Sequence, residues 1–332
     1  MRKQLKKRIV VIGGGTGCSV VLSGLRDSGH ELTAIVSMAD NGGSSGALRS
    51  ELGVLPPGDA RQCLAALSLS SGALRDVFGH RFSKGALKGH TVGNIVLAAA
   101  ELAAGNFSKA VRIVGEMLRV EGRVLASTLT NTDLVAELQD GTVLFGEAEV
   151  TASHGLSEIG VRRVFLRPEA RANPEAVAAI RAADLIVIAP GNLYSSLIPN
   201  FLIRGIARCL SASRAHKVYV ANLMTQKGHT DGFRVHDFSQ ALERHVGEQF
   251  LGTVLYNIEP VPARLLNRYR GRGETVRFDS RGASQYPHIR FVGKHLLSPV
   301  AVAVAKNDPL ASQRSFIRHD PKRLAMELLR LP

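Results

Sequence analysis

The chain has 332 residues, of which 45% are hydrophobic and 21% charged, with a formal net charge of +14. This composition is typical of a folded soluble protein and excludes a disordered chain. The basic balance suits anionic ligands, but Lys and Arg are scattered and Trp is absent, so we do not expect nucleic acid as a partner. Cys18, Cys63 and Cys209 lie far apart and predict neither disulfides nor a metal pair. No stretch has the length of a signal-peptide core or a membrane span, so we expect a cytoplasmic protein.

Short runs rich in Val and Ile alternate with segments of helical period along the chain. This pattern predicts an α/β fold with a mostly parallel sheet and helices on both faces. The expected strands are 9–12, 32–38, 123–127, 161–166, 185–189, 217–221 and 253–256, and the expected helices are 18–27, 60–68, 92–104, 174–182, 196–210 and 320–329.

We expect one domain over residues 1–332. The Leu/Ala-rich stretch at about 60–118 predicts a helical insertion that caps the sheet. Residues 132–159 read as a β-rich excursion, either a flap or a small side sheet, and the region at about 270–309 is the least regular.

A glycine-rich loop follows the first predicted strand in IVVIGGGTGCSVVLSGL. Glycines let backbone N–H groups approach a ligand closely, and the helix that follows adds a partial positive charge. The loop is not a Walker A motif, and Cys18 takes the third glycine position of a dinucleotide fingerprint. We therefore expect an anion cradle formed by Gly14, Gly15, Thr16 and Gly17.

The second strand is followed by MADNGGSSGALRSELG. Asp40 sits at the carboxyl end of that strand, where it can accept from a ribose hydroxyl or hold Mg²⁺ through water. The neighbouring amide, backbone N–H groups and hydroxyls belong to Asn41, Gly42, Gly43, Ser44 and Ser45. Ser44 also matches the centre of a G-x-S-x-G hydrolase motif, but this pattern is common in glycine-rich sequence and no triad partners stand out.

Two further helix starts carry polar groups. LPPGDARQCLAAL places Asp59 and Arg61 in one first turn, where Asp59 serves as helix cap or metal ligand. Arg61 opposes the helix dipole there, which indicates another purpose. GHTVGN brings His90 and Asn94 to the start of a second helix.

Two later strands also end in polar residues. APGNLYSSLIPN continues a buried strand and predicts a second anion-binding helix start, and NLMTQKGHTDG follows the next strand. Because the carboxyl ends of parallel strands share one edge, we interpret these segments together as a binding cleft. The candidate residues are Gly191, Asn192, Tyr194, Ser195, Asn222, Thr225 and Gln226.

Taken in order, GGGTG, ADNGGSSG, LPPGDARQCLAAL, GHTVGN, APGNLYSSLIPN and NLMTQKGHTDG resemble the gluconeogenesis factor (YvcK) family of the CofD-like superfamily, which includes 2-phospho-L-lactate transferase. The tail IRHDPKRLA fits the same family, so the resemblance spans nearly the whole chain. It implies a Rossmann-like fold, a UDP-N-acetylglucosamine-like ligand, and a role in cell shape and peptidoglycan precursor supply during gluconeogenic growth.

The resemblance also carries site residues and partners. It implies ligand phosphates near Gly14 to Gly17 and near the helix start after Gly191, with ligand contacts at Tyr269 and Arg318. It implies protein partners in cell-wall regulation and a homodimer. No cofactor is required for binding, although Mg²⁺ would suit a family transferase.

Two positions depart from the family pattern. The family commonly has a second acid where this chain has Asn41, and an acid where it has His229. One carboxylate fewer for Mg²⁺ favours a nucleotide-sugar-binding regulatory protein over a CofD-like phosphotransferase that would use Asp40 and Asp59. Whether the chain is an enzyme stays open; a nicotinamide dehydrogenase is disfavoured by Cys18.

Overall fold

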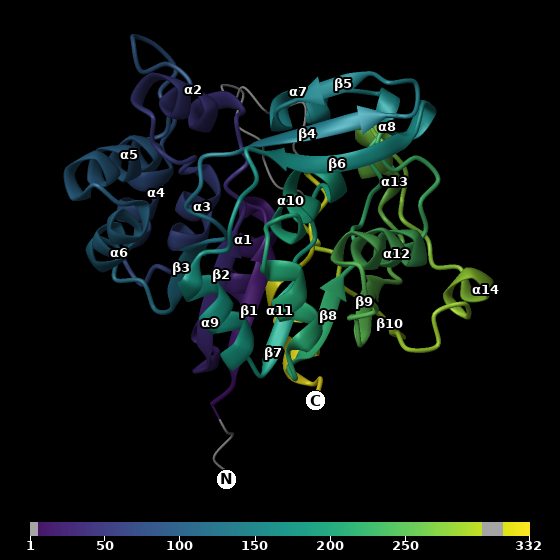
Figure 1. Cartoon of the computed structure of the whole chain (residues 1–332). Coiled ribbons are helices and arrows are strands. Elements are labelled where there is room, and N and C mark those ends of the chain that lie inside the picture. The colour runs from purple at the N-terminus through teal and green to yellow at the C-terminus, as the bar shows by residue number, and fades with distance from the viewer. Residues whose placement is uncertain (1–5, 301–314) are drawn as a thin grey trace.

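The computed structural model describes residues 6–300 and 315–332. Seven strands form one parallel sheet in the order β10-β9-β8-β7-β1-β2-β3 (Figure 1). Their bounds are β1 Arg8–Gly13, β2 Glu31–Val36, β3 Arg123–Ala126, β7 Leu185–Ile188, β8 His216–Val220, β9 Thr253–Asn257 and β10 Arg290–Lys294. The prediction of an α/β fold with a parallel sheet is confirmed.

Both faces of this sheet are covered, which explains why its central strands are apolar on both sides. Along β1, Ile9 and Val11 enter one core while Val10 and Ile12 enter the other. The first core also holds side chains of α1 Gly15–Leu25, α3 Gly58–Leu67, α5 Val92–Ala104, α6 Phe107–Met117 and α15 Pro321–Leu329. The second holds those of α9 Pro174–Ala182, α11 Ile206–Ala212 and α12 Val235–Val246.

A second, three-stranded antiparallel sheet lies above the main sheet in Figure 1. Its strands are β4 Asp133–Leu138, β5 Val143–Phe145 and β6 Val161–Arg167, and α7 Glu147–Ala152 and α8 Gly155–Glu158 connect β5 to β6. The expected excursion is thus a side sheet. Our placement of strand 161–166 in the main sheet was wrong, because β6 pairs antiparallel with β4 along its length.

The helix expected at 196–210 was wrong as one continuous element. The chain instead forms a π-helical turn at Leu193–Leu197, then α10 Ile198–Phe201 and α11. The break precedes α11 at Gly205, whose φ of +105° is one that L side chains rarely adopt. The less regular region contains α14 Ser280–Ala283 and β10, and its residues 301–309 lie outside the described part.

The remaining helices are α2 Gly43–Leu52, α4 Gly72–Gly79 and α13 Ala263–Tyr269. Helices α3 to α6 fill the predicted insertion at about 60–118. Across residues 6–300 and 315–332, none of the helices combines the length and apolar character that crossing a membrane requires.

Helix α1 packs against the C-terminal helix at a glycine. A Cβ added to Gly24 would lie 2.0 Å from the carbonyl oxygen of Pro321. We therefore expect Gly24→Ala to lower the free energy of unfolding by about 1–3 kcal/mol, as overpacking does. Urea unfolding followed by circular dichroism measures this change.

Gly72→Ala is the matched control, because no atom lies within 4 Å of the Cβ it would add. This control should leave stability unchanged or slightly raised. Equal stability of the two variants would contradict the tight packing of α1 on α15.

Candidate functional site

A cavity of about 580 Å³ opens at the carboxyl ends of β1, β7 and β8. The chain first adds β2 and β3 on one side of β1, and it later adds β7, β8, β9 and β10 on the other side. The cavity therefore lies at the topological switch point of the sheet, between β1 and β7. Ligands of open α/β folds bind at this position. Residues predicted from the sequence that line it are Gly14, Gly15, Thr16, Gly17, Asp59, Gly191, Asn192, Asn222, Thr225, Gln226, Tyr269 and Arg318.

The glycine loop touches the loop after β7. A Cβ on Gly17 would lie 1.7 Å from the carbonyl oxygen of Pro190, so only glycine fits there. Helix α1 starts after Gly14 without a side-chain cap. Its first N–H groups and the positive end of its dipole therefore face the cavity, which is the geometry of an anion site.

Asp59, in the first turn of α3, packs against the glycine loop. A Cβ on Gly15 would be 2.6 Å from its Oδ1 and from Gln62 Nε2, and Thr16 donates to Gln62 Oε1 over 2.9 Å. The first turn of α3 therefore buttresses the glycine loop and brings one carboxylate to it.

Side-chain amides connect the loops after β7 and β8. Asn222 Oδ1 accepts from the N–H of Gly191 (2.9 Å), and its Nδ2 donates to the Gly191 carbonyl (2.7 Å). Asn192 caps the next turn by accepting from the N–H of Ser195 (3.3 Å), and its Nδ2 donates to Gln226 Oε1. These amides hold the cavity wall in shape, whereas the sequence pattern suggested only direct ligand contacts.

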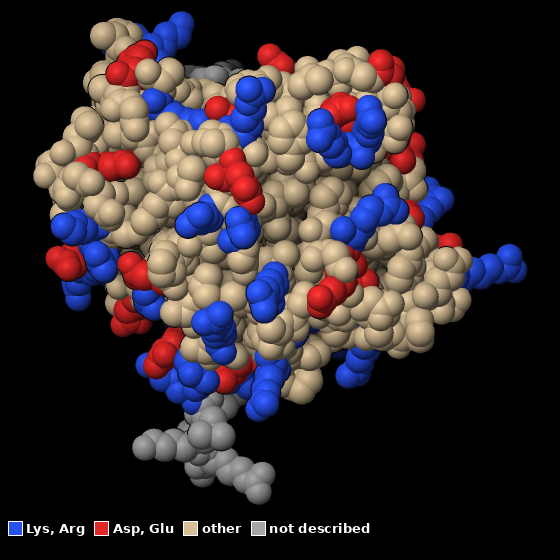
Figure 2. All heavy atoms as spheres, in the orientation of Figure 1, with Lys and Arg blue, Asp and Glu red and all other residues tan. Residues whose placement is uncertain are grey.

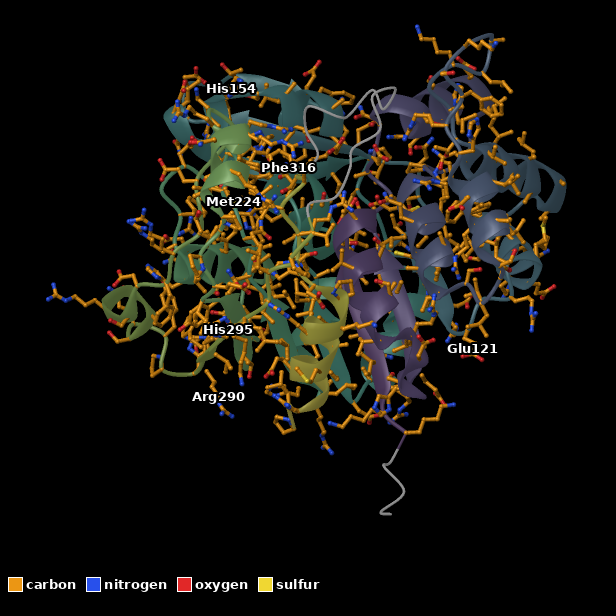
Figure 3. All side chains as sticks on the ribbon, turned by 180° about the vertical axis from the view of Figure 1, so that it is seen from behind. Glu121, His154, Met224, Arg290, His295 and Phe316 are labelled. Carbon is orange, nitrogen blue, oxygen red and sulfur yellow. The ribbon has the colours of Figure 1, made fainter. Side chains whose placement is uncertain are left out.

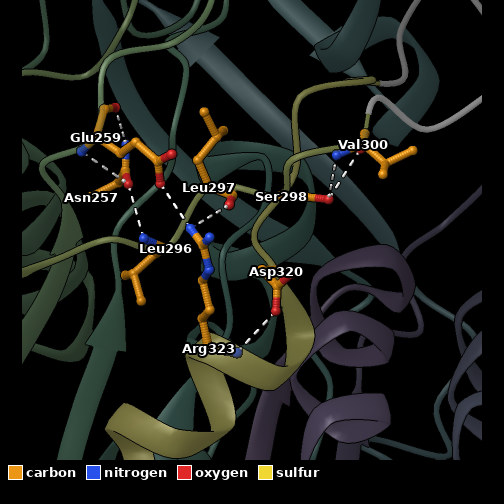
Figure 4. Close-up of polar contacts among 8 residues, drawn as sticks. All are labelled: Asn257, Glu259, Leu296, Leu297, Ser298, Val300, Asp320 and Arg323. Carbon is orange, nitrogen blue, oxygen red and sulfur yellow. Dashed lines mark hydrogen bonds and ion pairs between the residues drawn. The ribbon is translucent and has the colours of Figure 1, made fainter.

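The far wall is formed by the segment before α15. Ser298 N–H donates to the Arg318 carbonyl (2.9 Å), and Leu297 forms an isolated antiparallel β-bridge with His319. Figure 4 shows how this segment is fastened: Arg323 donates to Glu259 Oε2 (3.0 Å) and to the Leu297 carbonyl (3.3 Å). Burial lowers the pKa of His319 to about 4, so its ring is neutral at physiological pH.

An aromatic group stands beside this wall. Tyr269 packs edge to face on Phe316 with ring centroids 5.4 Å apart, and the Arg272 guanidinium lies 5.5 Å from the Tyr269 ring. In Figure 3, Phe316 and Met224 lie between His154 above and His295 below. Met224, His154 and Arg272 all line the cavity. The sequence offered no signal for His154.

The segment that connects β5 to β6 of the side sheet contributes the roof of the cavity through Thr151 and Ala152 of α7 and through His154. It is held by the loop after β8, because Ser157 N–H donates to the Gly228 carbonyl over 2.9 Å. His229 is 2% exposed and does not line the cavity; Gln226 Nε2 donates to its Nε2 over 3.4 Å. Burial lowers the pKa of His229, so this residue supports the roof as a neutral ring.

The charge of the cavity lining is mainly positive. Among described residues it carries Lys227, Arg272 and Arg318 against one carboxylate, Asp59. On the face shown in Figure 2, by contrast, Lys and Arg are interspersed with Asp and Glu. The cavity therefore attracts an anion specifically, whereas that face does not form one basic patch.

Other predicted residues lie outside the cavity lining: Asp40, Asn41, Gly42, Gly43, Ser44, Ser45, Arg61, His90, Asn94, Tyr194 and Ser195. Arg61 Nε donates to Asn94 Oδ1 (2.9 Å), Asn94 Nδ2 donates to Ser44 Oγ (2.9 Å), and Ser44 Oγ bonds His90 Nδ1 (3.1 Å). This network joins α2, α3 and α5.

The GGSSG segment is the start of a helix and not a loop, and it lies outside the cavity lining, so its contact with a ligand stays a prediction. Gly43 to Gly46 form the first turn of α2, because an added Cβ on Gly46 would meet the Asn41 carbonyl oxygen at 1.9 Å and only glycine permits this turn. Ser45 Oγ accepts from the Gly58 N–H over 3.2 Å. Ser44 is buried in a helix, which differs from the exposed strained turn of a hydrolase nucleophile.

Asn41 and Asp40 face the side sheet. Asn41 Oδ1 accepts from the N–H of Ala148 (2.8 Å) and so caps α7. Beside Asp40 lies Glu147, which accepts from Thr151 Oγ1 (2.7 Å) and bonds the Ser195 side chain. Burial, and next the Asp40 charge, raise the pKa of Glu147 to about 7. Asn41 leaves Asp40 without an adjacent acid in the sequence, but the fold places a second carboxylate, that of Glu147, beside it.

Asp40 and Glu147 supply only part of the ligand set that a metal ion needs. Within the described ranges, no three His, Cys, Asp or Glu side chains are grouped so that they could hold a metal ion. Asp40 and Glu147 provide two carboxylates, which suits only a Mg²⁺ that completes its octahedron with water and ligand phosphates.

The raised pKa of Glu147 predicts a pH dependence of stability. Because its pKa is about 7 in the folded chain against its usual 4.5, the folded state binds more protons between these values. The stabilising contribution of Glu147 is therefore complete below about pH 4.5 and is lost as the pH rises through about 7, by about 1–3 kcal/mol. Glu147→Gln should flatten this slope, as measured by urea unfolding from pH 4.5 to 8.

The matched control is Glu158→Gln, which removes an exposed carboxylate from α8. Its pH profile should follow that of the wild type. An unchanged slope in Glu147→Gln would contradict the raised pKa of Glu147 as the cause of the pH dependence.

Comparison with known proteins gives relatives along the whole chain. The model of the 2-phospho-L-lactate transferase CofD family matches residues 9–297. A putative gluconeogenesis factor of Thermotoga maritima is 40% identical, covering 96% of this chain and 97% of the relative. The gluconeogenesis factor of Bacillus subtilis is 39% identical and covers 98% of each chain.

A solved structure agrees with this result. The crystal structure of a UPF0052 family member from Bacillus halodurans superposes with a TM-score of 0.88 at 35% identity, covering 98% of this chain and 100% of that one. The two chains therefore share one fold over essentially their whole length.

Proposed function

Because the chain belongs to the CofD family and resembles gluconeogenesis factors over nearly its full length, we propose that it binds a UDP-N-acetylglucosamine-like nucleotide sugar in the cavity at the switch point. On this proposal it is a regulatory protein that supports cell shape and peptidoglycan precursor supply during gluconeogenic growth. It then acts through protein partners of cell-wall regulation, as a homodimer.

The observation that carries the proposal is the pairing of an uncapped helix start with a cationic wall. On this proposal a diphosphate binds between the N–H groups of the glycine loop and the side chains of Lys227, Arg272 and Arg318, which line the same cavity. A volume of about 580 Å³ is within the usual range for small-molecule sites. Tyr269 offers an aromatic surface for the base or sugar.

Calorimetry tests this binding. UDP-N-acetylglucosamine should bind more tightly than GDP or NAD, with no requirement for Mg²⁺. Gly17→Ala should weaken binding about tenfold or more, because its Cβ displaces the Pro190 carbonyl and with it the loop after β7. Equal affinities for the three nucleotides would contradict the proposal.

Gly79→Ala serves as the control for this variant, because it adds a Cβ with no atom within 4 Å. It should bind like the wild type. Circular dichroism of both variants separates loss of the site from loss of the fold.

A second candidate function is a CofD-like phosphotransferase that uses a nucleotide-activated phospho-lactate-type donor. The Asp40–Glu147 pair favours it, because two neighbouring carboxylates, with Asp40 beside Gly58 at the start of α3, suit a Mg²⁺ held jointly with phosphates. In that reaction Asp40 and Glu147 would hold the ion, which would supply charge neutralisation for the diphosphate. Asp59 would lie at the phosphate end of the donor.

Product formation from a panel of donors and acceptors tests the transferase. Turnover should require Mg²⁺, and Asp40→Ala should abolish it while leaving nucleotide-sugar binding measurable. Binding without turnover by the wild type across the panel would rule against the transferase and leave the binding protein standing.

A further inference from the structure

The edge strand β3 has backbone groups that the main sheet does not use. Alternate residues of a strand direct their N–H and C=O to opposite sides, and Ser127 N–H donates to Val36 of β2 over 2.9 Å. Val124 and Ala126 therefore present their backbone groups to the open edge. Asn173 Nδ2 covers the Ala126 carbonyl at 3.0 Å, whereas Val124 N–H and C=O have no partner within residues 6–300 and 315–332.

A second cavity lies along this edge. It has a volume of about 270 Å³ and is lined by α6, β3, the start of α9 and Leu64 of α3. Leu64, Val111, Val124 and Leu125 supply apolar surface within it. Backbone donors and acceptors beside apolar surface are what an extended peptide needs in order to add a strand.

Arginines surround the opening. Arg112 and Arg123 both pair with Glu175, at 3.8 Å and 2.8 Å, so the charge of this acid is already matched. The guanidinium of Arg119 makes no hydrogen bond or ion pair with any residue that the structure describes. Glu116 also lines the cavity, so the three arginines exceed the two carboxylates by one, and the rim keeps a net positive charge that suits a further carboxylate.

The backbone of Arg119 supports a role for its side chain. Arg119 follows α6 with a φ of +50°, and it is the one described residue other than glycine with a positive φ. Glycine is the usual residue after a helix in this conformation, since an L side chain costs about 1 kcal/mol there. Arginine therefore occupies a position where glycine would be more stable.

We propose that the cavity beside β3 binds an extended segment of a partner protein, which adds a strand through Val124 and places a carboxylate on Arg119. One residue of the segment accepts a hydrogen bond from the Val124 N–H through its carbonyl and donates its own N–H to the Val124 carbonyl. The side chains of its apolar neighbours point to the face of the sheet that holds Leu125. Its acidic side chain points to the opposite face, which holds Val111 and Val124, and reaches the rim at Arg119. The site is independent of the nucleotide cavity, so a failure of either proposal leaves the other standing.

The competing explanation is that the arginines merely keep a short edge strand solvated and prevent edge-to-edge association. It predicts no binding of extended peptides. The test uses the full-length chain labelled with ¹⁵N and the peptide acetyl-Thr-Val-Glu-Val-Thr-amide, with its Glu-to-Gln analogue as the control for charge.

Binding should shift the Val124 amide resonance and slow its exchange with solvent. The Gln peptide, and Arg119→Gly with the Glu peptide, should bind about threefold to fivefold more weakly, the usual worth of one exposed ion pair. Arg119→Gly should not lower the melting temperature, because glycine suits this backbone. Arg181→Ala, an exposed change on α9, should bind like the wild type.

Val124→Pro provides an independent variant. It removes the outward N–H without removing a hydrogen bond to β2, and edge strands tolerate proline. It should abolish binding. An unshifted Val124 amide at millimolar Glu peptide, or equal binding of the Glu and Gln peptides, would overturn the proposal.

Discussion

The contact between Gly17 and the carbonyl of Pro190 is the constraint on which the site depends. It joins the first loop of the sheet to the loop after β7, the two segments that flank the reversal in strand order. Because no side chain can stand between them, the helix start of α1 and the amides after β7 face one shared space. The side sheet, the loop after β8 and the segment before α15 then close that space from three directions.

Local sequence predicted the parts of the fold whose causes are local. The β1 loop and α1 were evident because a buried strand, a glycine run and an amphipathic helix follow one another within a few residues. Strand β6 was assigned to the wrong sheet because an apolar run has the same appearance whichever partner it pairs with. The break at Gly205 was missed because the apolar period of the helix continues on both sides of it.

The candidate site was predictable in outline and not in its side-chain roles. Strand ends identified the cavity wall, yet Asn41 caps a helix 107 positions away, and Glu147 joins Asp40 from a segment with no recognisable motif. Pairings of this kind depend on the tertiary fold, which a single sequence does not display. A count of acids next to Asp40 in the sequence was therefore a poor guide to the carboxylates around it.

Asn222 illustrates how strongly such geometry restricts the sequence. Its side chain offers one acceptor and one donor to the two backbone groups of Gly191, as a neighbouring strand residue would. Aspartate lacks the donor, and glutamine carries the amide one methylene too far from the backbone. In a saturation library selected only for folding, position 222 should thus tolerate almost no substitutions. Invariance at a cavity-lining position can in this way arise from architecture, before any ligand is considered.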